Sequence, residues 1–106
     1  MTSTWMAVPG VQGLSWVWRQ TQPAVVCRVI VWRDGYGAWR ASALVLGLRQ
    51  LRKDDYYSGR PGPAGLEACL DWLRALFDQP GDPVFDREAA RTVFDTQLPS
   101  TAKRPA

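Results

Sequence analysis

Three tryptophan–arginine pairs stand out among the side chains of this sequence: Trp18-Arg19, Trp32-Arg33 and Trp39-Arg40. An indole offers a flat π-face on which an unpaired base can stack, and a guanidinium offers a fork of N–H donors that fits a phosphate. The same two residue types are enriched in protein–protein interfaces. The pairs therefore predict a binding surface, with either a nucleic acid or a protein as its partner.

The spacing of each pair separates its two side chains. Neighbouring residues of a strand point to opposite faces of a sheet, so the indole goes one way and the guanidinium the other. A hairpin turn at Gly35 and Tyr36 would place Trp32 opposite Trp39. We therefore expect an indole-rich interaction face, built from Trp16, Trp18, Trp32 and Trp39. The alternative is that these large aromatic side chains form the core beneath the helices.

Basic residues suggest where phosphates would bind. The net charge is +3, from 13 basic and 10 acidic residues, which permits a polyanionic partner without requiring one. Positions 49–65 contain a basic cluster, then two aspartates, two tyrosines, and finally prolines and glycines, so we expect a long surface loop there. The predicted nucleic-acid-binding residues are Arg19, Arg33, Arg40, Arg49, Arg52, Lys53 and Arg60. The alternative for the cluster is a solvated loop with no ligand.

Catalytic chemistry finds little support in the sequence. The chain has no histidine, and so lacks the usual general base and the commonest metal ligand. Cys27 and Cys69 are too far apart in sequence for a metal-binding motif, and no glycine-rich phosphate loop occurs. A remaining candidate is the cluster of Asp54, Asp55, Tyr56 and Tyr57 in the expected loop. We expect a protein that is not an enzyme and that needs neither cofactor nor metal.

The elements that position these residues follow from hydrophobic periodicity. Alternation over 14–19, β-branched side chains over 25–33 and a return segment over about 38–46 predict three strands. Apolar residues at helical spacing predict a helix over 64–78. A second helix is expected from Arg87 to Gln97, with Asp86 as its N-cap.

This order predicts an α+β fold: a three-stranded antiparallel sheet, or a four-stranded one, followed by two helices packed on one face. We divide the chain into an N-terminal segment at 1–13 that has room for an extra strand, a single domain at 14–98 and a flexible tail at 99–106. Two helices can cover only one face of a sheet. The other face would stay exposed, and an exposed apolar face commonly marks an interaction site.

The cellular setting follows from what the sequence lacks. No apolar run reaches the 18 or so residues of a membrane span, and the first ten residues do not have the pattern of an export signal. Cys27 and Cys69 are expected to be separate, buried and reduced. We therefore expect a cytoplasmic protein with no membrane partner.

The segment from Val25 to Phe77 resembles the three-strand-plus-helix domains with which phage-type integrases grip their arm sites. The resemblance rests on "RDGYGAWRA" followed by the helical stretch "GLEACLDWLRALF", and it covers about half of the chain. It implies DNA binding, and we transfer no residue role from it.

Together these patterns predict a small, non-enzymatic binding protein. The favoured partner is DNA or RNA, bound through a sheet face and the adjacent basic loop. The alternative is a protein-interaction module that forms a homodimer or captures another protein through its surplus sheet face.

Overall fold

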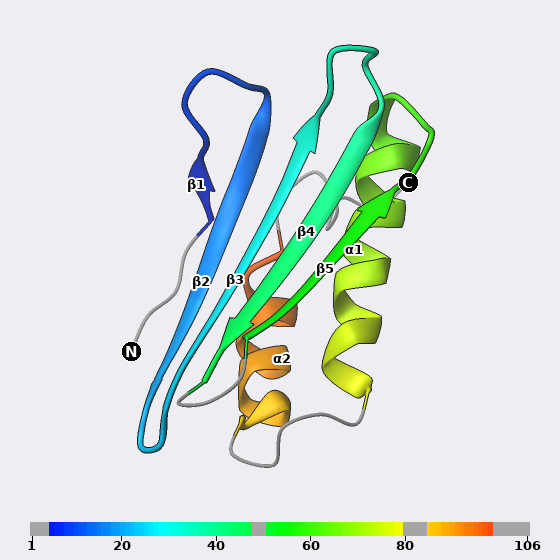
Figure 1. Cartoon of the computed structure of the whole chain (residues 1–106). Coiled ribbons are helices and arrows are strands. Elements are labelled where there is room, and N and C mark those ends of the chain that lie inside the picture. The colour runs from blue at the N-terminus through cyan, green and yellow to red at the C-terminus, as the bar shows by residue number, and fades with distance from the viewer. Residues whose placement is uncertain (1–4, 48–50, 80–84, 99–106) are drawn as a thin grey trace.

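The fold is α+β, as the sequence predicts. A computed structural model describes residues 5–47, 51–79 and 85–98. Five strands come first: β1 (Met6–Ala7), β2 (Gly13–Thr21), β3 (Ala24–Arg33), β4 (Trp39–Leu46) and β5 (Leu51–Tyr57). Two helices follow, α1 (Gly62–Asp78) and α2 (Arg87–Thr96). Figure 1 shows both helices on the same side of the sheet.

The sheet is an antiparallel meander in which every strand pairs with its neighbour in sequence, in the order β1-β2-β3-β4-β5. The N-terminal segment does supply an extra strand, because Met6 and Ala7 pair with Ser15 and Leu14. The predicted tail at 99–106 lies outside the described residues.

The fifth strand corrects our prediction of a surface loop over 49–65. Residues Leu51–Tyr57 pair with β4, from Leu46 opposite Leu51 to Arg40 opposite Tyr57. The strand was obscured by its charged side chains, which are typical of an edge strand protected against pairing with other chains. Residues 51–57 of the stretch predicted as a loop therefore contribute to both faces of the sheet, and its last residues, from Gly62 on, begin α1.

The register of the β3–β4 hairpin also differs from our prediction by one residue. Asp34 and Ala38 are hydrogen-bonded across the turn, with the Asp34 N–H donating to the Ala38 carbonyl at 2.9 Å. Three residues therefore lie in the loop, and Gly37 takes the positive φ of 84° that such a loop needs. Trp39 consequently pairs with Arg33, and Trp32 with Arg40. A shift of one residue moves a side chain to the other face, so Trp32 and Trp39 lie on opposite faces.

The helices match their predicted positions and faces. In α1 the buried residues include Leu66, Leu70, Leu73 and Phe77, which recur at helical spacing. Helix α2 begins after Asp86, whose side chain accepts a hydrogen bond from the Ala89 N–H at 3.1 Å and so caps the helix. Both helices turn their apolar stripes to the sheet.

The core lies between the helices and one face of the sheet, and three of the four predicted interaction-face indoles are on that side. Trp16 is fully buried, in edge-to-face contact with Phe94 at 5.4 Å, and its Nε1 donates to the Gln97 side chain. Trp39 is buried in the same cluster, and Trp18 packs against it. For these three indoles, the alternative reading as core residues is the correct one.

The two cysteines are buried and unbridged. Burial raises the pKa of Cys27 to about 12 and that of Cys69 to about 11, although a hydrogen bond from Ser58 lowers the pKa of Cys69 in part. Both thiols are therefore protonated at neutral pH and inert as nucleophiles. Among the described residues no helix has the length and apolar character needed to cross a membrane.

Candidate binding face of the sheet

The side of the sheet turned away from the helices is the candidate binding site, and we call it the open face. Its position follows from strand alternation, because Val25, Cys27 and Val29 of β3 are buried under the helices while the residues between them point the other way. Reading the register across β2–β5 gives the members of the open face as Gly13, Ser15, Val17, Arg19, Thr21, Ala24, Val26, Arg28, Ile30, Trp32, Arg40, Ser42, Leu44, Leu46, Leu51, Lys53, Asp55 and Tyr57. Figure 1 shows this side uncovered by either helix.

The open face is basic and the helical layer is acidic. The charged side chains of the open face are Arg19, Arg28, Arg40 and Lys53 against Asp55. Helices α1 and α2 carry five acidic and three basic residues: Glu67, Asp71, Asp78, Glu88 and Asp95, with Arg74, Arg87 and Arg91. The small net charge of the chain therefore does not show that one side of the molecule is basic and the other is acidic.

The two sides also differ in how many of their charged side chains form ion pairs. In the helical layer Arg91 pairs with Asp78, and Arg74 lies 3.0 Å from Asp95. On the open face Arg19, Arg28 and Lys53 form no hydrogen bond or ion pair with any other described residue, and all three are exposed. Basic side chains without an internal partner are available to an anionic ligand.

One row of the open face combines two aromatic rings with a guanidinium, and we call it the aromatic row. Trp32 of β3 lies opposite Arg40 of β4, which lies opposite Tyr57 of β5. The Arg40 guanidinium carbon is 4.4 Å from the centroid of the Tyr57 ring, a cation–π contact. Trp32 is half-buried and Tyr57 is 53% exposed, so ring surface remains accessible.

Arg40 is held in place by the turn that precedes its strand. Its Nε donates to Asp34 Oδ2 at 2.8 Å, while the other carboxylate oxygen accepts from the backbone N–H groups of Tyr36 and Ala38. The hydrogen bond from Arg40 is the main cause that lowers the pKa of Asp34 below its usual value. The Nη donors of Arg40 have no hydrogen-bond or ion-pair partner among the described residues.

Gly13 of β2 extends the aromatic row on the side of Trp32. A Cβ atom at this position would lie 2.6 Å from the Val31 carbonyl oxygen and 2.8 Å from the Trp32 Cβ, which is too close for either. Only glycine fits here without a shift of the backbone. No side chain of residue 13 therefore competes with a ligand for the space beside Trp32.

The structure divides the seven predicted basic residues. Arg19, Arg40 and Lys53 lie on the open face, as the nucleic-acid hypothesis requires. Arg33 and Arg52 lie on the opposite side, where Arg33 bonds to the Gly37 carbonyl and Arg52 to Asp54 and Gln79. Arg60 is exposed beyond the end of β5, and Arg49 lies outside the described residues.

Arg28 is a member of the site that our sequence analysis missed. It is the single charge within the aliphatic run of β3 and lies between the buried residues Cys27 and Val29. That isolated charge, read with strand alternation, was the available signal for a solvent-facing position. Tyr57 was considered only as part of a catalytic cluster, and its place in the aromatic row depends on β5 being a strand.

The acidic and tyrosine cluster proposed as a catalytic alternative does not form one site. Asp54 turns to the helix side and pairs with Arg52 at 2.9 Å, while Asp55 lies on the open face. Tyr56 stacks on Trp72 of α1 with ring centroids 5.3 Å apart, and Tyr57 points the other way. The described residues also contain no group of three or more His, Cys, Asp or Glu side chains placed to hold a metal ion.

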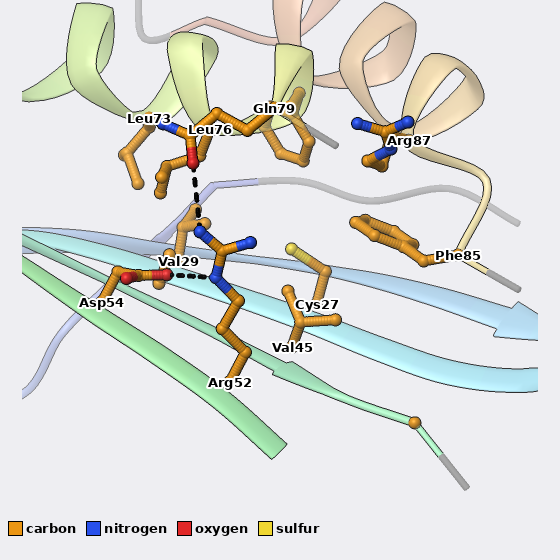
Figure 2. Close-up of a pocket in the computed structure, with 13 residues that line it drawn as sticks. Cys27, Val29, Val45, Arg52, Asp54, Leu73, Leu76, Gln79, Phe85 and Arg87 are labelled. Carbon is orange, nitrogen blue, oxygen red and sulfur yellow. Dashed lines mark hydrogen bonds and ion pairs between the residues drawn. The ribbon is translucent and has the colours of Figure 1, made fainter. Parts of the chain in front are cut away.

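A small cavity lies between α1 and the inner face of the sheet (Figure 2). Its volume is about 70 Å³, and its walls include Cys27, Val29, Leu73 and Leu76. Arg52 extends across one side of it, bonded to Asp54 at 2.9 Å and to Gln79 at 3.0 Å. A cavity that holds benzene measures about 150 Å³, so this one is too small for an aromatic or sugar ring. It is less suited to a ligand than the open face is.

Comparison with known proteins gives no further guide to this site: no protein-family model, curated protein or solved structure matches the chain. The resemblance to the arm-binding domains of integrases consequently has no support outside the residues on which it rests, and the sheet here has five strands where that comparison implies three.

Proposed function

We propose that this protein binds nucleic acid across the open face of its sheet. The observation that carries the proposal is the polarised charge: the unpaired cations Arg19, Arg28 and Lys53 lie on the open face, whereas the helices carry more acidic than basic residues and only Arg87 among their described basic side chains has no ion pair. Phosphates bound by such side chains release counterions, and this release drives most of the affinity for a polyanion.

The same charges disfavour the homodimer that we considered as an alternative. A two-fold dimer formed through the open face would bring each copy's Arg19, Arg28, Arg40 and Lys53 against the same set on its partner. Like charges brought together in an interface cost several kcal/mol. The open face fits a protein partner better if that partner is acidic, and such a partner remains the competing hypothesis.

The proposal is tested by fluorescence-anisotropy titration at several salt concentrations, with oligonucleotides longer than the ~4–16 nucleotides that one small domain covers. We expect binding that weakens steeply with salt. For single strands, log K should fall less steeply with log salt in the variant Arg28→Ala/Lys53→Ala. The slope should become less negative by about 1.4, since each lost phosphate contact removes about 0.7.

The matched control is Arg87→Ala/Arg91→Ala, which removes the same charge from the helical layer. Its slope should stay near that of the wild type. The proposal fails if no oligonucleotide binds more tightly than about 10⁻⁴ M at low salt, which is weaker than ordinary non-specific association. An equal loss of slope in both variants would also overturn it, because binding would then depend on net charge and not on the open face.

A further inference from the structure

The open face is not uniformly charged, and its apolar surface constrains the form of the nucleic acid. Between the charged side chains lie Val17, Ile30 and Leu44, which are half-buried, and Leu46 and Leu51, which are 49% and 65% exposed. A duplex presents phosphates and sugars to a flat surface and hides the faces of its bases in the stack. Only unpaired bases would bury this apolar surface and gain from doing so.

The aromatic row offers a place for a base. The Trp32 indole is the one tryptophan side chain on the described open face, and Gly13 leaves the position beside it without a side chain. At Tyr57 one ring face is already in contact with Arg40. Trp32 is therefore the better stacking partner, and Arg40 is its cross-strand neighbour on β4.

Basic side chains lie far enough from the aromatic row to contact the phosphates of a single-stranded nucleic acid that crosses the sheet. Arg28 is four residues before Trp32 on β3 and faces the same way, which separates the two positions by about 13 Å. Lys53 lies two strands from Arg28 in the same register row, with Leu44 between them. One end of the open face thus has aromatic character, and the middle has two unpaired cations.

From this arrangement, and resting on the proposed function, we infer that the ligand is a single strand with a base stacked on Trp32. The Nη donors of Arg40 and the side chains of Arg28 and Lys53 contact its phosphates. Stacking tolerates any base because every base has a π-face, so binding shows little sequence preference.

The experiment compares three probes of equal length: a single-stranded oligonucleotide, the same strand with abasic sites throughout, and the corresponding duplex. Wild-type protein should bind the single strand most tightly. Trp32→Ala should weaken binding of the single strand by about 5- to 150-fold, as expected for one lost stacking contact. The same substitution should leave affinity for the abasic strand nearly unchanged, and Trp32→Phe should recover part of the loss.

Val11→Ala is the control, because it removes an apolar side chain that is 47% exposed and lies outside the strands that form the open face. Circular dichroism of each variant verifies that it is folded. Equal affinity for all three probes, or no effect of Trp32→Ala, would overturn the inference and leave the proposed function intact. Tighter binding of the duplex would do the same. Failure of every probe to bind would overturn the proposed function itself.

Discussion

Two tryptophans that look alike in sequence have different surroundings, and the difference can be measured. Trp16 is fully buried among Phe77 and Phe94, whereas Trp32 lies half-buried on the open face. Trp16→Ala should lower the free energy of unfolding by about 3–5 kcal/mol, as expected for a large aromatic removed from a core. Trp32→Ala should cost much less. Urea denaturation of the two variants makes the comparison, and equal losses would mean that Trp32 is also a core residue.

The contribution of Asp34 to the stability of the fold should depend on pH. Its hydrogen bond from Arg40 lowers its pKa, so the folded state favours the ionised form more than the unfolded chain does. The stabilisation is present above the usual pKa of 3.8 and is lost as pH falls through the folded value. Asp34→Asn should therefore make the melting temperature less dependent on pH below about 4. Thermal melts of both proteins over this range test it. Parallel curves for variant and wild type would contradict the assigned role of Asp34.

The faces of Trp32 and Trp39 could not be predicted from the sequence, because they depend on the turn between β3 and β4. Each Trp-Arg pair does separate its indole from its guanidinium, as alternation requires. Which face receives the indole depends on loop length, and the three-residue loop closed by Asp34 and Ala38 reversed the position of Trp39 relative to Trp32. A glycine-rich turn permits more than one loop length, so its sequence does not decide the register.

Among the elements, α1 was the easiest to predict because its apolar residues repeat at one period and its ends are marked by proline and glycine. Leu73 is fully buried at its centre, and Leu51 of β5 is 65% exposed. Leu73→Ala should destabilise the fold by about 2–5 kcal/mol, and the control Leu51→Ala by less than about 0.5 kcal/mol. Chemical denaturation measures both. A small loss at Leu73 would show that α1 does not dock through this stripe.

The strand β5 was the hardest element to predict, for a physical reason. Its pairing with β4 depends on backbone hydrogen bonds, while its side chains alternate between partners on two different faces. A segment of mixed charges that is half-exposed on both sides gives no hydrophobic alternation for a strand prediction to detect. Lys53 was predicted as a binding residue, but its place on the open face beside Leu44, and that of Tyr57 beside Arg40, followed only from β5.

For the whole molecule, the central feature is a five-stranded sheet with both of the described helices on one side. The sequence predicted that a face would be left over, since two helices cannot cover both. The charge of this face could not be predicted from the net charge of the chain, because the positive charge of the open face and the negative charge of the helices largely cancel. The distribution of charge follows only from the register of the strands.

The most direct test of the account reverses charge on one side of the molecule at a time. Arg28→Glu/Lys53→Glu changes the open face, and Arg87→Glu/Arg91→Glu changes the helical layer by the same amount, so the two variants have equal net charge. Anisotropy titrations with one single-stranded oligonucleotide at one salt concentration compare them. We predict that the open-face variant loses binding and that the helical variant keeps most of it. Equal loss in both variants, or a larger loss in the helical one, would contradict the claim that the open face binds nucleic acid.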